Sequence, residues 1–325
     1  MSELLARIER DAGLPGLAEA LAAMAPSALR SVLLEATSGQ AARRDPAGLL
    51  AQAGRDGTVR PEASDARVLH ALDGHALDAA RGFEAVELAP VAPLGTNAVL
   101  GGIAQNNVLS TVRNTEVLAD PTAALALEAA LRRRAGETGT VRLCAVGRVL
   151  RLQPLGDKPG YTPHFRLFGL VSAGRATAEH GFEVAALAEH VRVQLRLLAA
   201  VGLDGEVELS DTRLPRLEGM RGRAHDPVES SLVDEFPGDA PVELQRLASA
   251  LPGARFDLHR PEGLGYYDGP MLRVCVTDAA GVRYAIGDGG LVDWTQRLLA
   301  NRKERLVISG LGLGLLAARF PIVVP

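Results

Sequence analysis

The sequence predicts an α+β fold: an antiparallel sheet flanked by helices and preceded by a helical N-terminal segment. The strand-like runs between residues 82 and 310 do not alternate regularly with helices, as they would in a doubly wound parallel sheet. Residues 1–78, by contrast, are rich in Ala, Leu and Arg and poor in β-branched residues, which favours helices. With 325 residues, 47% of them hydrophobic and 23% charged, the chain can bury a large core.

The N-terminal segment, residues 1–78, is expected to be a succession of helices. The apolar stripe that begins at Leu4 is interrupted at Pro15 and then resumes. New helices begin at Pro26 and Pro46, because proline suits a first helical turn, and a further helix is expected over 64–80. A helical cap or a dimerisation element is the simplest interpretation of this segment.

Residues 79–325 are predicted to form the core. Helices are expected at 121–134, 182–201 and 244–251, and strands at 83–88, 141–152, 165–172, 206–209, 256–258, 271–277 and 284–286. The polar stretch 214–240 contains several Pro and Gly residues and is predicted to be a mobile insertion. An apolar run at 306–318, with glycines at 310, 312 and 314, is expected to pack a strand against a helix. It is too short to cross a bilayer.

Composition excludes several functional classes. A net charge of −4, from 35 basic and 39 acidic residues, argues against a nucleic-acid-binding surface that covers the whole protein. The two cysteines, Cys144 and Cys275, form no CxxC pair, and the N-terminus lacks a signal peptide, so a cytoplasmic protein with no membrane contact is expected. No metal site is expected, because none of the seven histidines lies in a ligand-like cluster.

A predicted hairpin around residues 153–163 carries the first candidate site. Arg151 ends one strand, and an arginine on a rigid strand is a good planar clamp for phosphate or carboxylate. Arg166 and Phe168 lie on the return strand, where the phenyl ring could stack on a purine. The alternative is that Arg151 is a solvated edge residue and Phe168 is part of the core.

Three further patterns have both a functional and a purely structural interpretation. Tyr266 and Tyr267, between glycines, could line a pocket with two hydroxyls or pack onto a tight turn. The stretch 287–290, Gly-Asp-Gly-Gly, could let a ligand approach the backbone or could be a hairpin turn. Asp257 and His259 share one face of a predicted strand, which fits either acid–base work or a polar surface pair.

The order of these segments resembles the catalytic core of class II aminoacyl-tRNA synthetases from about Phe83 to Phe320. Within that class it looks most like histidyl-tRNA synthetase and its paralogue, the regulatory subunit of ATP phosphoribosyltransferase. The matching segments are 119–122 (the family's arginine-proline-acid-x-threonine loop), 142–154 and 162–168 (motif 2), 263–269 (the histidine-specific signature), 287–293 (the triple-glycine loop) and 310–316 (motif 3).

The resemblance implies an antiparallel sheet, a homodimer and a site for ATP with magnesium. Arg151, Phe168 and Arg166 would contact ATP, with Arg151 on the α-phosphate and Phe168 on the adenine. The substrate pocket implied by the resemblance comprises Asp120, Thr122, Gln153, Arg260, Tyr266, Tyr267 and Gly289. No catalytic residue is assigned.

The sequence also departs from the family pattern. The motif 3 arginine is replaced by Ala317 and the signature arginine by Glu262, with Arg260 nearby as a substitute. The family's acceptors for the substrate ammonium fall at Leu170 and about Gly174, whose side chains accept no hydrogen bond. No anticodon-binding domain is expected after the core. The loss of two arginines would cripple ordinary adenylation, since each such group typically changes a rate by roughly 10²–10³.

Two functional hypotheses remain open. In the first, the chain is a paralogue that does not charge tRNA, binds a small metabolite and regulates a partner such as a short ATP phosphoribosyltransferase. In the second, it is an ATP-dependent ligase that activates a different carboxylate through Arg151. A tRNA-binding role is disfavoured because the sequence shows no basic domain.

Overall fold

The computed structural model describes residues 3–153, 161–214, 232–233, 240–258, 260 and 262–322. Most of the predicted insertion 214–240, and residues 154–160 of the predicted hairpin, lie outside the described residues. The helices are α1 (Glu3–Asp11), α2 (Leu17–Ala22), α3 (Pro26–Ala41), α4 (Pro46–Arg55), α5 (Ala66–Ala79), α6 (Thr96–Gly101), α7 (Pro121–Arg134), α8 (Gly181–Ala200), α9 (Val242–Ala250), α10 (Trp294–Leu299) and α11 (Leu313–Arg319), with short 3₁₀ turns at Gln105–Asn107 and Ala178–His180.

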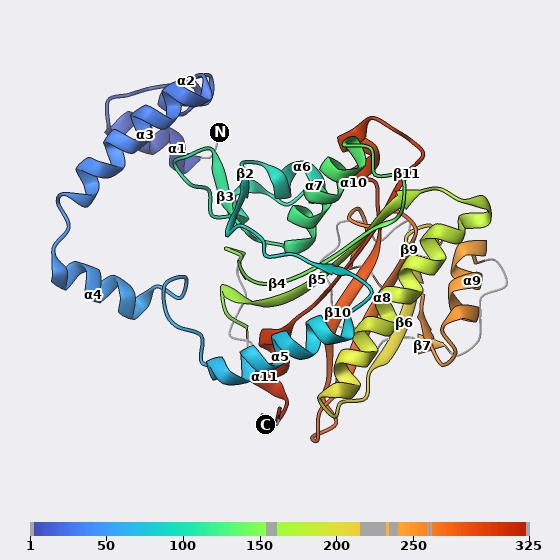
Figure 1. Ribbon diagram of the computed structural model, residues 1–325. Helices are drawn as coiled ribbons and strands as arrows, with labels where there is room; N and C mark the ends of the chain where they lie inside the picture. The colour runs from blue at the N-terminus through green and yellow to red at the C-terminus, as the bar shows by residue number, and fades with distance from the viewer. Residues whose placement is uncertain are drawn as a thin grey trace.

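The strands form one large sheet and one small one (Figure 1). They are β1 (Glu84–Ala85), β2 (Val91–Pro93), β3 (Thr115–Val117), β4 (Val141–Leu150), β5 (His164–Arg175), β6 (Glu206–Asp211), β7 (Leu232–Val233), β8 (Arg255–Asp257), β9 (Pro270–Thr277), β10 (Arg283–Val292) and β11 (Glu304–Leu311). The order in the large sheet is β1-β4-β5-β11-β10-β9-β6-β8-β7, and β2 pairs with β3 separately. Neighbours in the large sheet are antiparallel except for β1–β4 and β6–β8, which confirms the predicted fold class.

Two sequence expectations about the strands were wrong in detail. The glycine-rich stretch 287–290 is neither a turn nor a loop but the interior of β10, paired with β9 and β11. The strand expected over 83–88 shrinks to the two residues of β1, because only Glu84 and Ala85 pair with β4.

The two faces of the large sheet carry different helices. We call the face covered by α7 the front face. There Pro121, at the start of α7, lies against Gly169 of β5. We call the opposite face the back face. There Phe182 of α8 lies against Gly174, and α5 and α11 also contact β5. Strand residues alternate between faces, so a residue's parity decides whether it can take part in a front-face site.

The back face holds part of the hydrophobic core and a buried set of hydrogen-bonded side chains. Phe168 and Leu170 of β5 are almost fully buried there. His190 of α8 lies between Ser172 and Ser309, 3.0 Å from each hydroxyl. Burial lowers the pKa of His190 to about 3, so the ring is neutral and links α8 to β5 and β11 as a hydrogen-bonding group.

A buried ion pair ties α7 to β11. Arg133 and Glu304 form a two-pronged contact of 2.9 and 3.0 Å, and both side chains are only 3% exposed. The third nitrogen, Nη1 of Arg133, donates to the carbonyls of Glu137 and Gly139. The pair therefore fixes the C-terminal end of α7 against the start of β11, a central strand of the sheet.

We expect Glu304→Gln to lower the free energy of unfolding by about 3–5 kcal/mol, because it leaves the Arg133 charge buried without its counter-ion. The matched control is Glu84→Gln, which removes a partner of Arg132 that is 58% exposed and should cost less than about 1 kcal/mol. Urea denaturation of both variants measures the difference. Equal effects would contradict the role of the buried pair.

A second buried carboxylate organises the chain between β2 and β3. Glu116 is fully buried and accepts hydrogen bonds from the backbone of Gly95 and Asn97 and from the side chains of Asn97 and Gln105, at 2.7–2.9 Å. Burial alone would raise the pKa of Glu116, but these donors outweigh it and hold the pKa below its ordinary value of 4.5.

Because its pKa is lowered in the folded protein, Glu116 makes a contribution to the free energy of unfolding that depends on pH. We expect Glu116→Gln to cost about 1–3 kcal/mol at neutral pH, because an amide cannot accept from all four donors. The difference from wild type should be constant above the unfolded-state pKa. It should then shrink as acid protonates the folded carboxylate, which unfolding curves from pH 7 to pH 3 would show. A difference that grows on acidification would contradict this assignment.

The N-terminal helices α1–α5 are present as the sequence predicts. Among the described residues, no helix is long and apolar enough to cross a membrane.

Candidate functional site

The front-face site is built around a close contact between a helix and the sheet. A Cβ atom added to Gly169 would come within 2.9 Å of the Pro121 ring, so only glycine allows α7 to begin so near β5. Gly169 lies beside Ala145 of β4 and Gly310 of β11. Three successive cross-strand positions therefore carry no side chain larger than a methyl group, and they form a flat floor.

The start of α7 places Asp120 at the edge of this floor. As the N-cap residue, Asp120 accepts from the backbone and the hydroxyl of Thr122 at 2.8 and 2.7 Å. Its second oxygen faces Arg151, 3.3 Å away. Arg151 also donates to the carbonyl of Ala119 at 2.9 Å, so the end of β4 is fixed to the α7 cap. The structure thus brings Asp120, Thr122 and Arg151 together.

The aromatic partner of Arg151 is Phe165. The guanidinium carbon lies 5.3 Å from the centre of the Phe165 ring. Phe168, which the sequence suggested for stacking, is 1% exposed and belongs to the back-face core. The prediction failed on strand parity, because residues 165 and 168 are an odd number of positions apart in β5 and so face opposite sides.

The predicted ATP contact of Arg166 was also wrong. It faces the back of the sheet, where its guanidinium forms a two-pronged ion pair with Asp73 of α5. Arg166 therefore holds the N-terminal helix α5 against β5 and does not reach Arg151's side of the sheet.

The paired tyrosines cover the other end of the floor. Tyr267 packs on Gly290, where an added Cβ would come within 2.6 Å of the ring. Tyr266 meets Tyr267 and Trp294 edge to face, at 4.9 and 5.7 Å between ring centres. Burial raises the pKa of both phenols well above 10, so both hydroxyls remain protonated. Tyr266 hydrogen-bonds to Thr122 and Tyr267 to Asp288.

Asp288 is a site residue that the sequence analysis missed. It lies in β10 directly opposite Gly310, on the front face. Its side chain keeps 55% of its surface accessible, yet the surrounding protein displaces enough water that desolvation raises its pKa, against the opposing charge of Arg260. The sequence held a signal for it, because Asp288 is the one charged residue of the stretch 287–290. That signal becomes readable only when the stretch is placed inside a strand.

The arginines around Asp288 are already engaged. Arg260 is 2% exposed, donates to the Leu272 carbonyl at 2.7 Å, and lies 3.6 Å from Asp288. Arg273, opposite Asp288 on β9, contacts Glu262, Glu208 and Asp257 at 2.8, 3.2 and 3.5 Å. Glu262, in the position of the signature arginine, therefore neutralises a cation of the site and supplies none.

The remaining predicted residues lie elsewhere. Gly289 faces the back of the sheet, where an added Cβ would come within 2.5 Å of Ser309, so its role is close strand packing. Gln153 is exposed at the end of the described part of the hairpin. Asp257 is buried beside Arg273, whereas His259 lies outside the described residues. Ala317 lies in α11, and the next arginine, Arg319, stacks on Tyr284.

The described residues fit a magnesium–ATP complex poorly. Of Arg151, Arg260 and Arg273, only Arg151 has a side chain that is more than a quarter exposed. Its positive charge is already paired with Asp120. Within the described ranges, no group of three or more His, Cys, Asp or Glu side chains could hold a metal ion. Both cysteines are buried and free.

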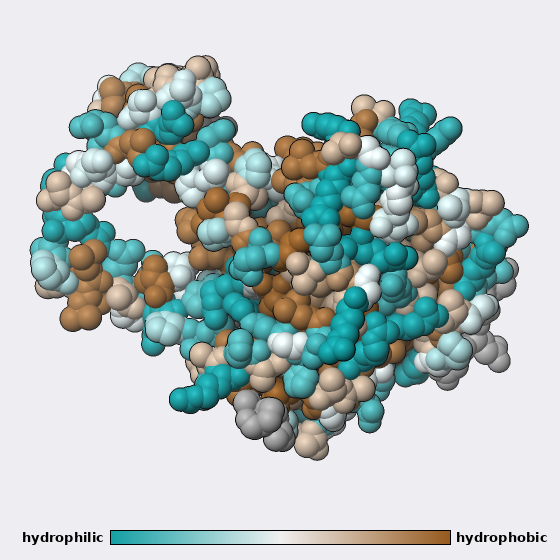
Figure 2. All heavy atoms as spheres, viewed as in Figure 1, coloured by the Kyte–Doolittle hydropathy of each residue, from teal (hydrophilic) through white to brown (hydrophobic). Residues whose placement is uncertain are grey.

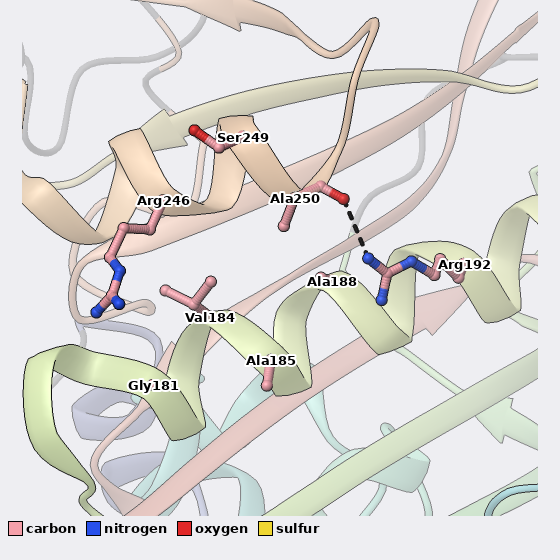
Figure 3. Close-up of a pocket in the computed structure, with 8 residues that line it drawn as sticks. All are labelled: Gly181, Val184, Ala185, Ala188, Arg192, Arg246, Ser249 and Ala250. Carbon is pink, nitrogen blue, oxygen red and sulfur yellow. Dashed lines mark hydrogen bonds between the residues drawn. The ribbon is translucent and has the colours of Figure 1, made fainter.

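A hollow of about 480 Å³ lies away from this site, between α8 and α9 (Figure 3). Small residues such as Ala185 and Ala188 line it. Its two arginines are engaged, Arg192 with the Ala250 carbonyl and Arg246 with Glu179. The hollow is therefore a shallow feature of helix packing and not part of the front-face site.

Comparison with solved structures identifies the fold. The chain superposes on an ATP phosphoribosyltransferase regulatory subunit/histidyl-tRNA synthetase from Bacillus halodurans with a TM-score of 0.56 and 16% identity, over 80% of this chain and 82% of that one. A histidine–tRNA ligase subunit from Alicyclobacillus acidocaldarius gives 0.58 and 18%, over 81% and 95%. Histidyl-tRNA synthetase from Nostoc sp. PCC 7120 gives 0.58 and 15%, over 80% and 73%.

The chain has the fold of a class II aminoacyl-tRNA synthetase catalytic core. No family model and no curated protein sequence matches it. At these identities the likeness concerns the fold of the synthetase-like core, and the chemistry must be argued from the site.

The Pro121–Gly169 contact makes a specific prediction. Gly169→Ala should cost about 1–3 kcal/mol, because the methyl group must push the start of α7 away from the sheet. The matched control is Gly147→Ala on the same face of β4, where an added Cβ meets no atom within 4 Å and stability should hold or rise slightly. Thermal and urea unfolding of both variants test this. Similar costs would show that α7 does not depend on Gly169.

Proposed function

We propose that this synthetase-like protein does not charge tRNA and instead binds a small metabolite in the front-face site, as a regulatory subunit for a separate catalytic chain. The observation that carries the proposal is charge neutralisation. Among the described residues of the site, Arg151 lies against Asp120, Arg260 against Asp288, and Arg273 against three carboxylates. A triphosphate would meet cations whose charge is already compensated, with carboxylates beside them.

The ligand class that suits this site is a small molecule with a cationic group. Asp288 offers a carboxylate that is 55% exposed and lies opposite Gly310 on the front face. A protonated amine is favoured there, because a hydrogen bond between an ammonium group and a carboxylate is charge-assisted and stronger than one between neutral groups. Leu170 and Gly174 face the back of the sheet, so Asp288 and not that strand supplies the acceptor.

The aromatic side chains would enclose the rest of such a ligand. Tyr266 and Tyr267 present protonated hydroxyls at one end of the floor, and Phe165 with Arg151 bounds the other. A short ATP phosphoribosyltransferase is the proposed catalytic partner. This follows from the sequence resemblance and from the described role of the Bacillus halodurans protein that shares the fold.

Two measurements test this proposal. ATP-dependent pyrophosphate exchange should stay at background with each common amino acid, since adenylation is not the activity. The Arg151→Ala variant should give the same background. Exchange with any carboxylate, abolished in Arg151→Ala, would favour an adenylate-forming ligase. Co-purification with a short ATP phosphoribosyltransferase, and activity of that enzyme that depends on this chain, would support the regulatory role.

Ligand binding is tested by thermal shift with histidine, histamine and imidazole-4-acetate as probes. An amine-bearing probe at 100 times its dissociation constant should stabilise the protein by about 2.7 kcal/mol, and imidazole-4-acetate should not. Asp288→Asn should remove the stabilisation. The control Asp293→Asn, at an exposed carboxylate paired with Arg297 outside the site, should leave it intact. Binding that survives Asp288→Asn would contradict the assigned acceptor.

A further inference from the structure

Helices α8 and α9 lie side by side and leave a groove between them on the surface of the molecule (Figure 3). We call it the α8–α9 groove and define it by the residues that line it: Gly181, Val184, Ala185, Ala188, Arg192, Arg246, Ser249 and Ala250. The alanine and valine side chains form its floor, which is therefore apolar. Ala185 and Ser249 are exposed, so the groove is open to solvent.

An arginine side chain crosses each end of the groove. At one end Arg246 of α9 donates to the carbonyl of Glu179, just before α8, and pairs with its carboxylate at 2.9 Å. At the other end Arg192 of α8 donates at 3.1 Å to the carbonyl of Ala250, where α9 ends. Figure 3 shows the two guanidinium groups at opposite ends, with the small side chains between them. The groove thus has an apolar middle and a cationic group at each end.

The positive charge at the Arg192 end is not compensated. A carbonyl contact orients the guanidinium group but brings no negative charge to it. One turn further along α8, Arg196 also donates to a carbonyl, that of Ala79. In the part of the chain that the structure describes, no carboxylate lies within ion-pair distance of either arginine. The arginines of the front-face site, by contrast, lie against carboxylates.

The Arg246 end is held by a weak contact. The side chains of Arg246 and Glu179 are 42% and 75% exposed, and an ion pair so open to water contributes little to stability. Glu179 also has a left-handed backbone, with a φ of 54°, which residues other than glycine rarely adopt. A carboxylate from another molecule can therefore replace that of Glu179 on Arg246 at small cost.

We propose that the α8–α9 groove binds an acidic amphipathic helix of another protein. The apolar face of that helix lies on the alanine and valine floor, and its carboxylates meet Arg192 and Arg246. Small floor residues let a helix approach closely, and binding of this kind uses apolar residues spaced three and four apart. Because α8 covers the back face of the sheet, such a partner leaves the front-face site open, and the inference is independent of the ligand proposed above.

Shape and charge favour a helix over other partners. A small-molecule site usually encloses most of its ligand, whereas this groove is a shallow hollow of about 480 Å³. A nucleic acid needs many phosphate contacts, which a chain of net charge −4 with so few uncompensated arginines here does not supply. Figure 2 shows hydrophilic and hydrophobic residues intermixed over the surface that carries α8, which suits a partner with both an apolar face and charges.

Fluorescence anisotropy with a labelled synthetic peptide tests the proposal on the full chain. The peptide has about 16 residues, enough to form a helix, with alanine and leucine on one face and glutamate at both ends of that face. One short helix buries a small area, as in transient complexes, so we expect a dissociation constant of roughly 1–100 µM for wild type. A peptide of the same composition in scrambled order should not bind in this range, because its apolar residues no longer share a face.

Variants on α8 separate the roles of charge and shape. Arg192→Glu should weaken binding of the peptide by about tenfold or more, since repulsion replaces a charge-assisted contact. Replacing the glutamate at one or the other end of the peptide by lysine should restore the affinity of this variant. Ala185→Trp, which fills the middle of the groove, should remove binding. The matched control is Arg67→Glu at the start of α5, where an arginine that is 86% exposed lies outside the groove and the affinity should hold.

The outcomes divide cleanly. A wild-type chain that fails to bind the peptide up to about 1 mM overturns the proposal. Equal binding of the scrambled peptide also overturns it, because attraction by charge alone would then suffice. Unchanged affinity in either Arg192→Glu or Ala185→Trp overturns the placement in this groove. Both of these residues are exposed, so circular dichroism and thermal unfolding should show that the variants keep their fold.

Discussion

The close approach of Pro121 to Gly169 is the contact on which the front-face site depends. It sets where α7 begins, and that position places the Asp120 cap over the floor of the sheet. Arg151 is then held by Asp120 and the Ala119 carbonyl, and Thr122 meets Tyr266. At the other end of α7, the Arg133–Glu304 pair prevents the helix from sliding. Because α7 is fixed at both ends, the side chains at its start have defined positions beside the small residues of the sheet.

The electrostatic character of the site follows from pairing. Three carboxylates converge on Arg273, one lies against Arg151, and Asp288 lies beside the buried Arg260. A synthetase that grips ATP needs uncompensated guanidinium groups directed at the phosphates, whereas this site distributes its positive charge among its own acids. The same scaffold can thus lose phosphate affinity while it keeps its shape, because the sheet and helices do not depend on the ligand-facing charges.

The N-terminal arm, residues 3–56 with helices α1 to α4, shows a different relation between sequence and packing. Its helices begin where proline and aspartate caps direct them, as at Asp45 and Pro46, so local chemistry suffices to form them. Local chemistry does not say where they pack. The ion pairs at the arm's root fix its point of departure, and the apolar residues beyond remain without cover in the single chain.

By itself, the sequence determined the fold class and the bounds of α7, whereas the expected site residues came from the family resemblance. These follow from propensity, caps and motif order, which are local or linear properties. Only the tertiary structure decided which face each strand residue takes. It exchanged Phe168 for Phe165, sent Arg166 to Asp73 on the back face, and brought Asp288 to the floor beside Gly310. The physical reason is that a side chain's face depends on where its strand begins to pair, and that register is set by neighbours far away in the sequence.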